Sequence, residues 1–172
     1  MTEEEVLHAL HKKALGNLGR RDYSERQLAA ALLNLKKWYP RSRLYREYTS
    51  NRVDKVIKEL VSGGFINERR SLRNMLEAAK AGQYGIRRIR MRMIRQKYKK
   101  EYIEEVLRES GDFEQQQDMS KIIRLAKSKK TQWEAKYAGD RKKLATVRTR
   151  LIQFLASKGF TMDTINRLLP HL

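Results

Sequence analysis

The sequence has no cysteine among its 172 residues, only two prolines and nine glycines. Without cysteine, disulfides, thiol nucleophiles and thiolate zinc sites are excluded. Alternation of apolar and polar residues, the signal for strands, is almost absent. No apolar run approaches the roughly 18 residues that span a bilayer, and the acidic start MTEEEVLHAL lacks the pattern of a signal peptide. We therefore expect an all-α, cytoplasmic protein with no membrane segment.

Signals for catalysis are equally scarce. The three histidines are His8, His11 and His171, and no carboxylates converge on them in the sequence. There is no G-x-x-x-x-G-K-[ST] loop, and Gly63-Gly64 is typical of a helix end rather than of a phosphate-binding turn. The acidic pair Glu104-Glu105 is typical of a solvated helix face. We expect no catalytic residue, metal site or cofactor, so the protein is predicted not to be an enzyme.

Positive charge is what the chain has in excess. Its formal net charge is +19 and its pI about 10.3. Residues 85–150 hold 20 Lys and Arg against 9 Asp and Glu, so the middle of the chain is the most basic part. Such a balance predicts attraction to polyanions rather than a particular fold.

Helical spacing of apolar residues runs along the whole chain. The expected helices cover about 3–18, 25–39, 53–61, 69–80, 86–96, 100–109, 118–137, 143–157 and 162–169. Ser24-x-x-Gln27 fits a capping box. Three segments are alike, VIKELVSGGF, IRMRMIRQKY and LIQFLASKGF, each ending in an aromatic residue. Chance similarity among amphipathic helices is one explanation; the other is a set of tandem helical units in an elongated, curved body.

The helix expected at 86–96 has the strongest charge pattern. Between Gly85 and Lys100 there are eight cations and no acid. At 100° per residue, Ile86, Ile89 and Met93 share one face, and Arg88, Arg92 and Arg95 lie opposite. Uncompensated guanidinium groups repel one another unless an external anion is bound, and phosphate is the commonest such anion. The alternative is that these cations only keep the protein soluble.

A second basic run follows in the helices expected at 118–137 and 143–157, and its contacts would hold a nucleic acid without reading its sequence. The residues that we predict to contact DNA or a protein–DNA filament are Arg87, Arg88, Arg92, Arg95, Lys99, Lys121, Arg124, Lys127 and Arg148. Residues 38–48 form a loop with four aromatics among arginines. Trp38, Tyr39, Tyr45 and Tyr48 either stack on bases or anchor a partner, or else cover the core beneath a long loop.

Four motifs, in order, resemble those of the RecX family, regulators of the bacterial RecA recombinase. They are RDYSERQL at 21–28, GFINE at 64–68, YGxxRI with Met93 at 84–93, and FLxxKGF at 154–160. The resemblance implies tandem three-helix repeats, at 23–82, 83–138 and 139–172, after an N-terminal helix at 1–22. It also implies binding in the groove of the RecA–DNA filament, direct binding of single- and double-stranded DNA, and lower RecA ATPase, strand-exchange and coprotease activity in recombination and SOS repair. We expect a monomer.

The chain departs from the family pattern at a few positions. An acidic pair and then an aromatic are usual after the first G-[FY], whereas here the pair is Asn67-Glu68 and Ser71 stands where the aromatic would be. Lys97 stands where the middle repeat usually has its turn glycine, and Gln27 replaces a usual glutamate. The alternative function is a stand-alone basic DNA-binding protein or helix-turn-helix regulator. A groove-reading helix would carry Asn, Gln or Ser among its cations, and here only Gln96 is present.

Overall fold

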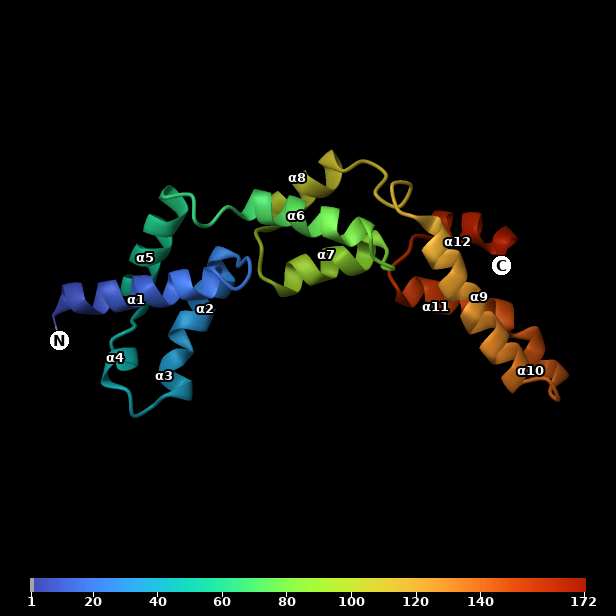
Figure 1. Cartoon of the computed structure of the whole chain (residues 1–172), viewed down its shortest axis with the longest axis horizontal. Coiled ribbons are helices and arrows are strands. Elements are labelled where there is room, and N and C mark those ends of the chain that lie inside the picture. Colours follow the sequence, from blue (N-terminus) through green and yellow to red (C-terminus); the bar gives the residue numbers. More distant parts are fainter. Residues whose placement is uncertain (1) are drawn as a thin grey trace. The chain divides into compact units, whose positions relative to one another are not determined.

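The computed structural model describes residues 2–172, and within them the chain is helical, with no strand. Figure 1 shows the helices in chain order. They are α1 (Glu3–Leu18), α2 (Glu25–Leu33), α3 (Leu35–Trp38), α4 (Arg43–Arg46), α5 (Ser50–Ser62), α6 (Glu68–Lys80), α7 (Ile86–Arg95), α8 (Lys100–Glu109), α9 (Met119–Lys136), α10 (Arg141–Ala145), α11 (Val147–Ser157), α12 (Met162–Leu168) and the 3₁₀ helix η1 (Leu169–His171). None of the helices in residues 2–172 combines the length and the apolar character needed to cross a bilayer. The all-α prediction and the helical repeat architecture are confirmed.

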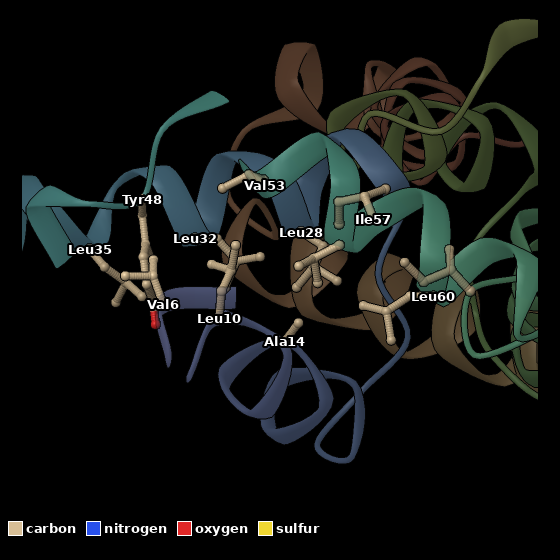
Figure 2. Close-up of a cluster of buried hydrophobic side chains, with 12 residues drawn as sticks. Val6, Leu10, Ala14, Leu28, Leu32, Leu35, Tyr48, Val53, Ile57 and Leu60 are labelled. Carbon is tan, nitrogen blue, oxygen red and sulfur yellow. The ribbon is translucent and has the colours of Figure 1, made fainter. Parts of the chain in front are cut away.

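The chain divides into two compact units. One runs up to Arg73 and takes in Met93–Val106, and the other comprises Asn74–Arg92 with Leu107–Leu172. In the first unit, α1, α2 and α5 pack against one another. Figure 2 shows their apolar side chains pointing into one cluster. The cluster consists of Val6, Leu10, Ala14, Leu28, Leu32, Leu35, Tyr48, Val53, Val56, Ile57, Leu60 and Ile66. The core residues of α1, α2 and α5 recur at helical spacing, as the sequence pattern predicted, and Tyr48 and Ile66 join them from outside the helices.

The second unit has its own core, built by α9, α11 and α12. It consists of Ile122, Ala126, Val147, Leu151, Leu155, Phe160, Ile165 and Leu168. The repeat boundaries that the resemblance implies put residues 118–138 in the second repeat. In the structure α9 instead packs on α11, so the C-terminal bundle begins at Met119. Helix α9 is long and basic, and its stripe of Ile122 and Ala126 gives no sign in the sequence of which bundle it joins.

Three helix ends repeat one backbone motif. α5, α7 and α11 are each followed by a residue with positive φ, namely Gly64 (74°), Lys97 (60°) and Gly159 (92°). The next residue in each case donates its N–H to a carbonyl five residues back: Phe65 to Leu60, Tyr98 to Met93, and Phe160 to Leu155. This is the Schellman ending of a helix. The three similar segments noted in the sequence thus share their backbone geometry, which supports true repeats over chance similarity.

Lys97 is the one non-glycine residue with positive φ within residues 2–172. A side chain in this left-handed conformation costs roughly 1–2 kcal/mol. The departure from glycine has therefore not changed the turn, and the surrounding helices hold Lys97 in it. The aromatic residues after these turns differ in burial, because Tyr98 and Phe160 are buried whereas Phe65 is exposed.

The predicted capping box at α2 is only half formed. Ser24 Oγ accepts the N–H of Gln27 at 3.1 Å, as expected. The Oε1 atom of Gln27 has no hydrogen-bond partner within the described residues, so the return bond is absent. Ser24 Oγ instead donates to the carbonyl of Gln96. The serine therefore ties the start of α2 to the turn that follows α7.

Candidate nucleic-acid interface

Helix α7 places its arginines as predicted. Ile89 and Met93 are buried, whereas Arg88, Arg92 and Arg95 are exposed on the opposite side. We call these three residues the arginine face. No carboxylate in residues 2–172 lies within ion-pair distance of them. The face therefore presents three charges with no acidic partner in the described chain.

A mixed strip runs along α7 beside the arginine face. It consists of Arg87, Met91 and Ile94, which are all exposed. Met91 and Ile94 are 48% and 44% exposed, so two large apolar side chains remain in water next to four cations. A nucleic acid backbone alone offers little for them to contact. Apolar residues beside arginines are typical of protein–protein contacts, in which methionine adapts to irregular surfaces.

Two glycines fix the position of α7. The N–H groups of Gly85 and Arg87 donate to the carbonyls of Lys158 and Gly159 at 3.0 and 3.1 Å. A Cβ on Gly85 would lie 2.3 Å from the carbonyl oxygen of Gly159. A Cβ on Gly159 would lie 2.5 Å from the backbone nitrogen of Arg88. Only glycine allows the two backbones to meet so closely, so the family-like glycines at 85 and 159 position the helix that carries the arginine face.

A buried carboxylate completes the start of α7. The first turn of α7 holds arginines and no acid, which its helix dipole disfavours. Glu114, only 2% exposed, compensates from another segment. It accepts the N–H of Ile86 at 3.1 Å and the hydroxyl of Thr161, the N-cap of α12, at 2.7 Å. One carboxylate therefore serves the starts of two helices.

Glu68 has the same role in the first unit. It is 4% exposed and accepts the N–H of Glu25, at the start of α2, at 2.9 Å. Its other oxygen accepts the N–H of Lys99, just before α8, at 3.1 Å. Asn67 caps the first turn of α6 by accepting the N–H of Arg70 at 3.0 Å. The single glutamate left from the usual acidic pair is thus a structural link between helix starts.

One aromatic ring lies among the cations at the start of α7. Tyr84 has the guanidinium of Arg88 over its ring at 4.4 Å and the ammonium of Lys158 at 5.0 Å. Such cation–π contacts restrain Arg88 without neutralising it. Tyr84 and Lys158 are not among the contact residues predicted from the sequence, although both stand in the family-like motifs.

Lys99 differs from the other predicted contact residues. Its ammonium lies 2.7 Å from the carboxylate of Glu25 and over the ring of Tyr102. The hydrogen bond that Lys99 donates to Glu25 raises the pKa of Lys99 above its usual value. Lys99 therefore has an internal partner and contributes to the fold of the first unit.

The remaining predicted residues lie in the second unit. Lys121, Arg124 and Lys127 are exposed on α9, directed away from the buried Ile122 and Ala126. The pKa of Asp118 lies below its usual range, first because Ser120 donates to its carboxylate and further because Lys121 and Arg124 are nearby. Arg148 is exposed on α11 and lines an open groove of about 610 Å³ together with Lys130 and Glu134. The α9 cations and Arg148 thus form two local surfaces.

The four loop aromatics differ in burial, and two of them cover the core whereas two are free to contact a ligand. Tyr48 is buried and Tyr45 packs against the first core, so these two cover the core. Trp38 and Tyr39 are 62% and 56% exposed.

The described residues contain no group of three His, Asp or Glu able to hold a metal. Glu105, predicted to be solvated, pairs with Arg69 at 2.9 Å.

Comparison with known proteins agrees with this architecture. A family model described as RecX, third three-helix domain, matches residues 130–169. A "Regulatory protein RecX" from Pseudomonas putida strain W619 is 26% identical over 161 residues, covering 94% of this chain and 89% of the relative. The chain is thus similar to RecX proteins over 94% of its length. A RecX protein from Ectopseudomonas mendocina is also 26% identical, over 94% of this chain and 93% of its own.

A solved structure supports the fold over nearly the full length of this chain. The crystal structure of RecX from Lactobacillus salivarius matches with a TM-score of 0.70, covering 98% of this chain and 97% of its own, at 14% identity. The predicted resemblance is confirmed, and the relatives are named as regulatory proteins.

Proposed function

We propose that this protein regulates a RecA-type recombinase by binding in the groove of its filament on DNA. Binding would lower ATP turnover, strand exchange and coprotease activity in recombination and SOS repair. The protein would act as a cytoplasmic monomer and a regulator, not as an enzyme, and would also bind single- and double-stranded DNA directly. The observation that carries the proposal is the arginine face, three exposed guanidinium groups without an acidic partner on a helix of a chain similar to RecX proteins.

The arginine face and the mixed strip of α7 suit two kinds of contact. The arginine face presents unpaired positive charge that a phosphate backbone or an acidic filament surface would neutralise. The adjoining Met91 and Ile94 remain 48% and 44% exposed, and a protein surface would cover them. A ligand that binds one filament state more tightly shifts the population toward that state. Restricting the filament to one state would slow the changes that accompany ATP hydrolysis.

The α9 cations extend the proposal to a second contact. Lys121, Arg124 and Lys127 are exposed along one helix, and Arg148 is exposed on its neighbour α11. We assign them to sequence-independent phosphate contacts. Lys99 is left out of this assignment, since Glu25 already neutralises it at 2.7 Å.

The test is a titration of the protein into a RecA ATPase reaction on single-stranded DNA. The parent protein is expected to inhibit at or below one molecule per recombinase. Replacing Arg88, Arg92 and Arg95 together with alanine should raise the required concentration about tenfold or more. The slope of log affinity for single-stranded DNA against log salt should flatten by about 2, because roughly 0.7 counterions are released per phosphate contact.

A matched control removes three other exposed cations, Lys12, Arg20 and Lys58, and so makes the same change in net charge. This variant should inhibit nearly as well as the parent. Equal losses in both variants would show that net charge, and not the arginine face, drives binding. No inhibition by the parent, together with tight sequence-selective duplex binding, would support a helix-turn-helix regulator instead.

A further inference from the structure

A short basic segment of the first unit runs from Lys36, inside α3, to Arg46 at the end of α4. Residues 36–46 read KKWYPRSRLYR, with five cations and no acid. We call this segment the aromatic tip. Lys36, Lys37, Arg41 and Arg43 are exposed, and none of them has an acidic partner within residues 2–172. The next acid in sequence, Glu47, is paired with Arg52 at 2.7 Å.

Two large aromatic side chains at the tip face water. Trp38 is 62% exposed and Tyr39 is 56% exposed. The other tryptophan, Trp133, is partly buried and packs edge-on against Phe154 at 6.1 Å in the second core. Leaving such rings in water has an unfavourable free energy that burial would recover. Their position among unpaired cations therefore needs a reason other than packing.

The tip is held in shape from beneath. The ring of Tyr39 contacts that of Tyr45 at 5.5 Å, and Tyr45 contacts the buried Tyr48 at 5.4 Å between centroids. Arg46 donates through Nε and Nη2 to the carbonyl of Pro40 at 3.0 and 2.7 Å. The loop is thus tied across its base, and Tyr39 is connected to the core through tilted and edge-on ring contacts. A preformed surface loses little entropy when it binds.

We propose that the aromatic tip is a binding site for single-stranded nucleic acid, with bases stacked on Trp38 and Tyr39. Lys36, Lys37, Arg41 and Arg43 would contact the phosphates on either side. Rings interleaved with cations are the combination that single strands require, because every base has a face to stack and every nucleotide a charge. In a duplex the bases are stacked on each other and cannot reach the rings. The site therefore gives a preference for single strands that the arginine face alone does not provide.

The proposal rests on the proposed function only in taking nucleic acid as a ligand, and its test contains no recombinase. Replacing Trp133 with phenylalanine leaves Trp38 as the only tryptophan, since the chain has two. Adding oligo(dT) to this variant should quench the tryptophan fluorescence. The reciprocal variant, Trp38→Phe, retains Trp133 and should show little quenching. Equal quenching of the two variants would overturn the assignment.

Affinity gives the second measurement. The double variant Trp38→Ala/Tyr39→Ala should bind oligo(dT) at least about tenfold more weakly, since each base stack contributes roughly 1–3 kcal/mol. Its affinity for duplex DNA should stay within about twofold, and its melting temperature should fall only slightly, because Tyr39 loses its ring contact with Tyr45. A matched control is Phe65→Ala, which removes another aromatic side chain of the first unit that is 57% exposed. This variant should bind like the parent.

An abasic oligonucleotide separates stacking from charge. It keeps the phosphates but has no bases. The parent should therefore bind the abasic strand no more tightly than the double variant binds oligo(dT). If the parent binds abasic and normal strands equally, the rings do not stack on bases. If an acidic peptide such as poly-glutamate quenches Trp38 and competes with oligo(dT) at similar concentration, the tip is a protein-docking surface and the proposal is wrong. Failure of these tests would leave recombinase inhibition through the arginine face unaffected.

Discussion

Arg52 on α5 and the arginine face on α7 use the same side chain in opposite ways. The guanidinium of Arg52 donates to Glu3 at 2.9 Å and to Glu47 at 2.7 Å, which joins α1, α5 and the turn before α5. The arginines at 88, 92 and 95 have no such partner in the part of the chain that the structure describes. The protein therefore has one set of charges that holds the fold and another that is available to an external anion.

The difference gives a rule for separating the two sets. A change to a charge with an internal partner should alter stability and leave DNA binding nearly unchanged. A change to an unpaired charge should do the reverse. Glu68, Glu114, Lys99 and Arg52 belong to the first set, whereas the arginine face and the exposed cations of the aromatic tip belong to the second.

The largest expected effect comes from a buried partner. Glu114→Ala removes the acceptor for the N–H of Ile86 and for Thr161, and should lower the free energy of unfolding by about 3 kcal/mol, because unsatisfied buried groups each cost about 1–3 kcal/mol. Denaturant unfolding measures the loss. Glu114→Gln keeps an acceptor oxygen and should lose clearly less. Equal stability of the alanine variant and the parent would contradict the role given to Glu114.

A smaller effect, this time a gain in stability, is expected at Lys97, which its turn holds at φ 60°. Lys97→Gly should raise the free energy of unfolding by about 0.5–1 kcal/mol, since relief of the left-handed strain exceeds the extra flexibility of glycine in the unfolded chain. The comparison variant Lys97→Ala removes the charge but keeps the strain, and should gain nothing. Equal gains in the two variants would mean that charge repulsion, not backbone conformation, is relieved.

Arg52→Ala tests an exposed paired charge and should lower the melting temperature slightly at pH 7. Its hydrogen bond holds the pKa of Glu3 below the usual 4.5. Because the folded pKa is depressed, this stabilisation is present above about pH 4.5 and is lost as the pH falls below it. The melting temperatures of parent and variant should therefore converge by about pH 3. A difference that persists there would point to lost packing.

The smallest stability effect is expected at the arginine face. Replacing Arg88, Arg92 and Arg95 with alanine should leave the melting temperature unchanged in high salt. At low salt the melting temperature of the variant should rise slightly above that of the parent. Repulsion between the three arginines is unscreened there, and the variant lacks it. Thermal unfolding at about 10 mM and 1 M salt compares the two conditions. A clear loss of stability in both would show that these arginines have structural roles.

Much of the helical structure could be predicted from the sequence, because helix boundaries depend on local signals. The range 3–18 matched α1 and 100–109 matched α8 to the residue. Segment 143–157 proved to be two helices, α10 and α11, separated at Thr146. Membership of α9 in the C-terminal bundle was not predictable, because it depends on tertiary contacts.

The site was predictable only in part. Exposure of the α7 arginines follows from helical periodicity, which places them opposite Ile89 and Met93. The pairing of Lys99 with Glu25 joins residues that lie far apart in the sequence, so no local pattern reveals it. The same holds for Trp38 and Tyr39, whose exposure depends on how Tyr45 and Tyr48 fill the space beneath them.

The meeting of Gly85 with Gly159 has a consequence for synthesis on the ribosome. Helix α7 is made midway through synthesis, yet the carbonyls that accept the N–H groups of Gly85 and Arg87 belong to Lys158 and Gly159, near the carboxyl end. Until that end leaves the exit tunnel, the start of α7 lacks the carbonyls that accept its N–H groups. A nascent chain therefore cannot present its most basic helix in final form, and the surface that attracts polyanions matures among the last.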